Sequence, residues 1–242
     1  MRTGPTAPAV GRLVRVTDEL PLFPLNTVLF PGQTLQLHVF EERYRALVRH
    51  LLTVADRSQR LFGVVAIREG HEVGSHGVQS VHRVGCVAQM TSVAPADEGR
   101  FDIEVVGRER FQLRALDSSG EYLVGTVETA SDVGDPSVRA GAGSTEADRA
   151  RATFAAYRDR ISQIRGADML DVVLPAEPVY LSYTLAATCL LSLPQRQELL
   201  EIGSADERLA MLRHLMREEM RAMQAVPSLP ATEVSRTGWS AN

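Results

Sequence analysis

The first half of the chain alternates between apolar and polar residues over several short segments. The alternation is clearest in 34–40, where Leu35, Leu37 and Val39 share one face, as in a half-buried strand. Comparable segments recur at intervals of about 8–12 residues with turn residues between them, which favours a β-barrel or a β-sandwich. Further strands are expected at 61–67, 84–93, 100–107, 109–116 and 121–130.

Prolines modify the first apolar segment. Residues 20–25 read Leu-Pro-Leu-Phe-Pro-Leu, and a proline has no N–H to donate to a neighbouring strand. We therefore expect an edge strand, or an extended segment that leads into the fold. Pro31 and Gly32 then predict a turn ahead of the alternating strand.

The apolar spacing changes to a helical period in two parts of the chain. Residues 41–55 carry one apolar stripe and predict a single helix within the β-rich half. The second half is expected to hold helices at 146–164, at 178–191, in a short stretch after Ser192 and at 204–223. Ser204 and Glu207 have the spacing of a capping box, which predicts the start of the last helix.

These patterns divide the chain into a β-rich part and a helical part, which is an α+β fold class. A stretch rich in Gly, Ser, Asp and Ala separates the two parts and is typical of a linker or a long loop. Both ends are rich in proline and small residues, so we expect them to be disordered. The expected division is a disordered N-terminus at 1–17, a β subdomain at 18–130, a linker at 131–145, an α-helical subdomain at 146–223 and a disordered tail at 224–242.

The composition excludes several kinds of chemistry. The net charge is -4, so the chain lacks the bulk positive field that duplex nucleic acid attracts. All 26 basic residues are arginine and none is lysine. The chain therefore cannot contain the lysine of a P-loop, of a Ser-Lys peptidase dyad or of a Schiff base.

Cysteine usage and hydropathy indicate the compartment. Cys86 and Cys189 are far apart in the sequence and do not form a disulfide framework or a metal spacing. Residues 1–17 contain no apolar core of a signal peptide, and no stretch approaches the roughly 20 apolar residues that span a bilayer. We expect a cytoplasmic protein with no membrane partner.

Residues 20–44 read LPLFPLNTVLFPGQTLQLHVFEERY: a proline-rich strand, a Phe-Pro-Gly turn, an alternating strand and a Phe-Glu-x-Arg-Tyr helix start. This order resembles the opening signature of the amino-terminal substrate-binding domain of the Lon proteases. Segments 84–90 (VGCVAQM), 106–111 (VGRERF) and 181–219 resemble later parts of that domain, in the expected order. The resemblance covers about residues 20–222, nearly all of the chain that we expect to be ordered.

The resemblance implies both a fold and a role. It implies a PUA-like β pseudobarrel with one helix, followed by an α-helical bundle, and a function in holding protein or peptide substrates. In Lon proteases this domain precedes a nucleotide-driven motor and a Ser-Lys peptidase. We expect a stand-alone form without either, which acts as a non-catalytic adaptor or client-holding protein, with no cofactor. The alternative is an RNA-binding PUA-like protein.

A cluster of metal-capable side chains precedes the strand at 84–93. His71, His76, His82 and Cys86 lie within 16 residues and invite a zinc hypothesis, because zinc prefers imidazole and thiolate ligands. Their spacing matches no zinc motif, so we favour a polar loop that leads into a strand and expect no metal.

Arginines are the other candidates for binding. Arg43 could hold a ligand carboxylate, but we favour an ion pair with a carboxylate on a neighbouring strand that fixes the helix. Arg108, Arg110 and Arg114 cluster on one turn and strand and are the best indication of nucleic-acid binding. Acidic neighbours and the lack of evident exposed aromatic residues argue against that interpretation.

Serine and methionine residues complete the candidates. Ser75 and Ser182 do not lie in the Gly-x-Ser-x-Gly pattern of a nucleophile elbow. The methionines of the last helix could form an adaptable surface, but their spacing favours packing inside the bundle. We therefore name no catalytic, metal, cofactor or peptide-binding residue, and expect the binding site in a cleft between barrel and bundle.

Overall fold

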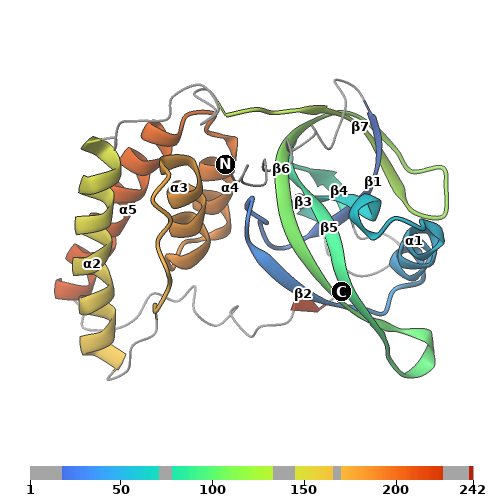
Figure 1. The fold of residues 1–242 in the computed structure, drawn as a ribbon, viewed down its shortest axis with the longest axis horizontal. Coiled ribbons are helices and arrows are strands. Elements are labelled where there is room, and N and C mark those ends of the chain that lie inside the picture. Colours follow the sequence, from blue (N-terminus) through green and yellow to red (C-terminus); the bar gives the residue numbers. More distant parts are fainter. Residues whose placement is uncertain (1–17, 71–77, 133–144, 166–169, 226–239, 242) are drawn as a thin grey trace, which may run out of the picture.

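The structure is a computed structural model that describes residues 18–70, 78–132, 145–165, 170–225 and 240–241. The strands are β1 (Asp18–Leu25), β2 (Thr34–Val39), β3 (Leu61–Gly70), β4 (Val78–Val81), β5 (Val84–Pro95), β6 (Phe101–Asp117), β7 (Leu123–Thr129) and β8 (Ser240–Ala241). The helices are α1 (Glu42–Thr53), α2 (Thr145–Arg165), α3 (Pro178–Thr188), α4 (Leu193–Glu201) and α5 (Ala205–Ala225), with short 3-10 helices at Arg57–Gln59 and Asp97–Gly99. Helices α2–α5 gather on one side and the strands curve into a barrel on the other (Figure 1).

Five strands close a ring. β1 pairs in parallel with β3, while the contacts β3–β5, β5–β6, β6–β7 and β7–β1 are all antiparallel. β2 extends the sheet at β6, and β4 extends it at β3. Ring closure removes most of the unpaired edge that an open sheet would expose. The expected pseudobarrel with one helix, followed by a helical bundle, is confirmed.

The interior of the ring is built by side chains of alternate residues. All five ring strands contribute to one buried cluster that centres on Phe111 of β6. Gly85 makes room for that ring, because a Cβ atom at Gly85 would lie 2.5 Å from the Phe111 Cζ atom. The other face of the sheet packs against β2 and α1, where the Phe23 and Tyr44 rings stack at 4.3 Å between centroids. Helix α1 therefore covers the barrel on the side away from the bundle (Figure 1).

The expectation of an edge strand at 20–25 is wrong, because β1 lies between two neighbours. Its first half, Asp18–Leu22, pairs with β7, and its second half, Leu22–Leu25, pairs with β3. Each half therefore has one side without a paired strand, where a proline that lacks an N–H is tolerated. Pro21 and Pro24 lie in different halves.

The two strands expected at 100–107 and 109–116 are one continuous strand, β6. Gly107 does not turn the chain. A Cβ atom at Gly107 would lie 2.2 Å from the Phe30 carbonyl oxygen, so glycine permits the close approach of the 30–33 turn. The Gly107 N–H donates to the Gln33 carbonyl at 2.9 Å, and the Gly107 carbonyl accepts from the Gly32 N–H at 2.9 Å.

The helical part has its own core, and the barrel contributes to it. Val28, Phe30 and Ala66 pack in one cluster with buried residues of all four bundle helices. α3 begins at Pro178, as expected, but ends at Thr188 rather than at Leu191. Ser192 caps α4 reciprocally with Gln195, and the Ser204 hydroxyl accepts from the Glu207 N–H at 3.4 Å at the start of α5. Within the described residues, every helix falls short of the length or apolar character that crossing a membrane requires.

The expected disordered ends and linker, at 1–17, 131–145 and 224–242, lie for the most part outside the described residues. Two residues at the start of the expected linker, Ser131 and Asp132, are described, and they take part in the contacts presented next. The short strands β4 and β8 were not expected from the sequence.

Candidate functional site

Helix α4 holds the bundle against the barrel. The Arg196 guanidinium donates through Nη2 to the Val28 carbonyl at 3.0 Å and lies 5.1 Å from the centroid of the Phe30 ring. The Gln197 amide donates to the Val84 carbonyl at 3.1 Å. These bonds satisfy backbone carbonyls of the barrel with side chains of the helix, so they fix the two parts relative to one another.

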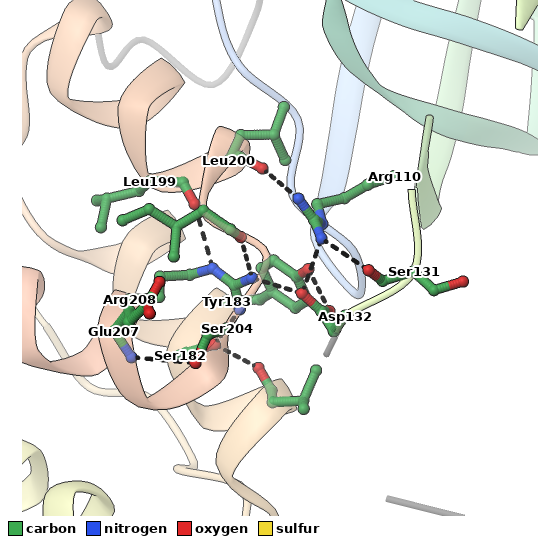
Figure 2. A network of polar contacts seen from close by, with 12 residues as sticks. Arg110, Ser131, Asp132, Ser182, Tyr183, Leu199, Leu200, Ser204, Glu207 and Arg208 are labelled. Carbon is green, nitrogen blue, oxygen red and sulfur yellow. Dashed lines mark hydrogen bonds and ion pairs between the residues drawn. The ribbon is translucent and has the colours of Figure 1, made fainter. Parts of the chain in front are cut away.

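A buried polar network surrounds the Asp132 carboxylate at the same junction (Figure 2). Its Oδ1 atom accepts from Arg110 Nη2 at 3.0 Å and from Arg208 Nη2 at 2.6 Å. Its Oδ2 atom accepts from the Tyr183 hydroxyl at 2.5 Å. One carboxylate therefore joins β6, the segment after β7, α3 and α5.

Arg208 is fully buried and has a partner for each of its three nitrogens. Nε donates to the Leu199 carbonyl at 3.1 Å, Nη1 donates to the Ser182 hydroxyl at 2.6 Å, and Nη2 also donates to the Ile202 carbonyl at 2.7 Å. The guanidinium carbon lies 4.0 Å from the centroid of the Tyr183 ring. Carbonyl dipoles and a ring face thus replace the water that the cation loses on burial.

Arg110 is the second buried cation of the network. Nη1 donates to the Leu200 carbonyl at 2.9 Å and Nη2 to the Ser131 carbonyl at 3.4 Å. Two cations thus share one carboxylate, and backbone carbonyls accept from further nitrogens of both, whereas Arg110 Nε is buried without a hydrogen-bond partner among the described residues. Burial raises the pKa of the Tyr183 hydroxyl above its ordinary value of 10.0, so Tyr183 keeps its proton and remains a donor to Asp132 at alkaline pH values at which a solvated tyrosine ionises.

The polar groups of this network bond to one another and are buried away from any ligand. Arg110 is 4% exposed and Ser182 and Arg208 are 0% exposed, so no ligand reaches their polar atoms without opening the junction. The Ser182 hydroxyl donates to the Val179 carbonyl at 2.7 Å and has no base at hand. The network is therefore a structural anchor between barrel and bundle, and it excludes Ser182 as a nucleophile.

An open groove lies where the sheet divides. The Leu113 N–H donates to the Arg83 carbonyl at 2.7 Å, and beyond this bond β4 and the end of β6 separate. The space between them has a volume of about 460 Å³ and is closed at one side by Glu201 of α4. It is lined by Arg68, Ser80, Val81, His82, Arg83, Leu113, Arg114, Ala115, Leu116 and Glu201.

The three arginines that suggested nucleic-acid binding do not form one surface. Arg110 points into the barrel–bundle junction. Arg108 donates to the Gln89 side chain, and Arg114 pairs with Glu128 at 2.7 Å. The three arginines are close in the sequence, but the fold places their side chains in different environments.

The two metal-capable residues that the structure describes, His82 and Cys86, lie in different places. His71 and His76 lie outside the described residues. His82 lies 3.7 Å from Glu201 at the groove, whereas Cys86 is buried in the core, where burial raises the pKa of its thiol. Among the residues that the structure describes, no group of three or more His, Cys, Asp or Glu side chains is placed to hold a metal ion.

The remaining candidates have local structural roles. Arg43 pairs with Glu41 at 3.2 Å at the start of α1, so the favoured ion pair is present, but its carboxylate belongs to the N-cap residue of the same helix and not to a neighbouring strand. Ser75 lies outside the described residues. Met216 and Met223 are buried in the bundle core, and Met211 and Met220 are partly buried against it, which confirms packing for the methionine stripe.

Three residues of these sites were not identified from the sequence. Asp132 lies in a segment that reads as a linker, and Arg83 follows a polar stretch. Arg208 offered a signal, because it occupies the apolar stripe of α5 between Ala205 and Leu212. A charged residue at such a position predicts a buried ion pair.

Comparison with known proteins identifies the family. Residues 19–218 match the family described as the ATP-dependent protease La (LON) substrate-binding domain. The Lon protease of Escherichia coli strain K12 is 26% identical over 217 residues, which cover 85% of this chain and 25% of that protein. Lon protease 2 of Herpetosiphon aurantiacus is 27% identical over 213 residues, 86% of this chain and 25% of that protein. The chain spans about a quarter of the length of these relatives.

Solved structures share the fold. A Lon N-terminal domain protein from Xanthomonas campestris superposes with a TM-score of 0.54 at 21% identity, covering 88% of this chain and 99% of that one. The N-terminal domain of a Mycobacterium avium complex Lon protease gives a TM-score of 0.56 at 20% identity, covering 83% and 99%. In this chain, buried arginines join a curved barrel to a helical bundle. The family match extends over residues 19–218, and the chain therefore belongs to the LON substrate-binding domain family.

Proposed function

We propose that this chain is a recognition module that binds unfolded or partly unfolded polypeptide without turning it over. The observation that carries the proposal is the family match, which extends over residues 19–218 and is to a substrate-binding domain alone. Such a module acts as an adaptor, or holds clients for another machine.

The chemistry of the chain supports binding without catalysis. A chain without lysine has neither the phosphate-binding lysine of a P-loop nor a Ser-Lys dyad. Of the two serines considered from the sequence, Ser182 lies within the described residues, where it is buried and bonded to Arg208. Cys86 and Cys189 are buried thiols that are not joined in a disulfide, which supports a reducing cytoplasm as the compartment.

A binding assay with a permanently unfolded protein tests the proposal. Reduced, carboxymethylated lactalbumin carries a fluorescent label, and its anisotropy is followed as the chain is added; native lactalbumin is the control. We expect saturable binding of the unfolded form only, because native lactalbumin buries the apolar segments that such a module would hold. Absence of saturation up to about 100 µM, which is weaker than specific recognition requires, would refute the proposal.

A second assay tests the lack of turnover. The chain is incubated with casein and ATP, and peptide fragments and free phosphate are measured over hours. We expect neither product. Reproducible hydrolysis of casein or of ATP would contradict a non-catalytic role.

A further inference from the structure

The groove between β4 and β6 exposes two strand edges. Residues 115–117 of β6 pair with β7 on one side, after a register shift at Arg114, and no described strand pairs with residues 114–117 on the other side. β4 pairs with β3, and no described strand pairs with its second side. Register shifts at Arg114 and within the β3–β4 ladder produce this division of the sheet. Such irregularities bend a strand away from its neighbour and leave backbone groups available to an added strand.

The groove is rich in positive charge although the chain is acidic overall. Arg68, Arg83 and Arg114 line it, in a chain with a net charge of -4. Arg83 is exposed, and its Nη1 atom donates to the Leu113 carbonyl at the long distance of 3.5 Å. Arg114 pairs with Glu128, but a guanidinium has five donors and can bind a second carboxylate.

The acidic residue at the groove is already bonded. Glu201 accepts from the Gln197 amide at 2.8 Å and lies 3.7 Å from His82 Nδ1. Because one carboxylate faces three arginines in the lining, it neutralises their charge only in part. The groove favours a ligand that carries negative charge.

The apolar part of the groove distinguishes between classes of acidic ligand. Leu116 is 46% exposed, one of four large apolar side chains that the described residues expose, and Val81 and Ala115 lie beside it in the lining. The lining has no Phe, Tyr or Trp side chain on which a base could stack, and its one imidazole, His82, lies 3.7 Å from the Glu201 carboxylate, which repels phosphate. An acidic peptide therefore fits better than a single-stranded nucleic acid.

We propose that this groove binds an extended, acidic segment of a polypeptide by strand addition. The backbone of the ligand pairs with the exposed edge of residues 114–117 or of β4, its carboxylates meet Arg83 and Arg114, and an apolar side chain covers Leu116. The volume of about 460 Å³ lies within the range of about 300–1,000 Å³ that is usual for ligand sites. The inference rests on the proposed function and adds the chemical class of the client and the place where it binds.

Matched peptides test the charge preference. Three labelled peptides of equal length alternate valine with glutamate, with lysine or with serine, and their affinities are compared by anisotropy. We expect the glutamate peptide to bind about tenfold more tightly than the serine peptide, with a preference that falls as salt is added, and the lysine peptide not to bind. Equal affinities for the three peptides would overturn the inference.

A charge reversal locates the site. Arg83→Glu should weaken the glutamate peptide about tenfold or more, because attraction becomes repulsion. Arg217→Glu, the same change at an exposed residue of α5 outside the groove lining, is the matched control and should bind like the natural chain. Circular dichroism confirms that both variants are folded. An unchanged affinity in Arg83→Glu would place the peptide elsewhere and overturn the inference.

Backbone pairing is tested without altering the protein. The glutamate peptide is N-methylated at alternate residues, in the two frames that block one edge or the other. One frame should abolish binding, and hydrogen exchange of residues 78–81 or 114–117 should slow only with the active peptide. If neither frame affects binding, strand addition is wrong.

The outcomes separate this inference from the proposed function. If unfolded lactalbumin binds but the acidic peptide shows no preference, only the present inference fails. If neither ligand binds, the proposed function fails. If an oligouridylate of equal length displaces the acidic peptide and binds more tightly, the groove is a nucleic-acid site and the peptide assignment is wrong.

Discussion

Arg110 and Arg114 lie on the same strand, β6, but each belongs to a group of arginines in a different environment. Arg110 points into the barrel–bundle junction, where it and Arg208 share the Asp132 carboxylate away from water. Arg114 points into the open groove, where it joins Arg83 and is paired with Glu128 at the surface. The first group is committed to the protein, whereas the second is accessible to a ligand.

The difference shows that burial decides what an arginine does. A buried guanidinium that loses its partner costs several kcal/mol, because no water replaces the lost bonds, so its contribution is to stability. An exposed ion pair contributes little to stability, because water solvates both partners equally well when they separate. Variants of the first group should therefore change stability, and variants of the second should change binding.

The largest effect is expected when the shared carboxylate is removed. Asp132→Ala leaves two buried cations without an anion and should lower the free energy of unfolding by about 3–5 kcal/mol. Urea denaturation followed by circular dichroism measures this change. Asp132→Asn keeps one oxygen acceptor and should be intermediate. A loss in Asp132→Ala no larger than that of an exposed pair would show that the junction does not depend on the network.

A smaller effect is expected from the hydroxyl that completes the network. Tyr183→Phe removes one hydrogen bond to Asp132 and leaves both arginines in place, so the free energy of unfolding should fall by about 1.5–3 kcal/mol. The same urea experiment at neutral pH measures it.

The pH dependence of stability sharpens this prediction. Burial raises the pKa of Tyr183 in the folded chain above the ordinary value of 10.0. The stabilisation is therefore fully present below about pH 10 and is lost as the pH rises further, because only the unfolded chain gives up the proton readily. The natural chain should lose stability steeply above pH 10, and Tyr183→Phe less steeply. Tyr157 and Cys86, whose pKa values burial also raises, should contribute to the remaining slope, and identical slopes in both chains would contradict this account.

Local sequence patterns predicted the elements whose residues carry one clear period. The helix at 41–55 and the strand at 34–40 follow from their apolar spacing, and both occur with small changes at the ends. Long-range contacts set the features that were missed. The sequence around Gly107 suggests a break between two strands, but glycine is required there because the carbonyl of Phe30 approaches closely. The proline-rich segment lies in the interior of the sheet because its two halves pair with different strands on opposite sides.

The candidate sites were less predictable for the same reason. Asp132 is separated in the sequence from Tyr183 by 51 residues and from Arg208 by 76. Because its own segment has the composition of a linker, no local pattern indicated that its carboxylate accepts hydrogen bonds from both. Arg83 became a candidate only because it lines the groove between β4 and β6, which local sequence patterns do not reveal. Sequence spacing grouped Arg110 with Arg114, but the strand directs them to different surroundings.

The smallest effect on stability is expected at Arg114, where one substitution distinguishes a role in stability from a role in binding. Arg114 is exposed, and its guanidinium lowers the pKa of the Glu128 carboxyl. The pair therefore adds stability above the ordinary carboxyl pKa and loses it as the pH falls through the lowered value, with salt weakening it throughout. Arg114→Ala should leave the urea midpoint at neutral pH nearly unchanged and should return the Glu128 pKa, followed by NMR, to its ordinary value. The same variant should weaken the acidic peptide. A large loss of stability with unchanged peptide binding would reverse the roles of the two groups, because Arg114 would then belong to the structure and not to the site.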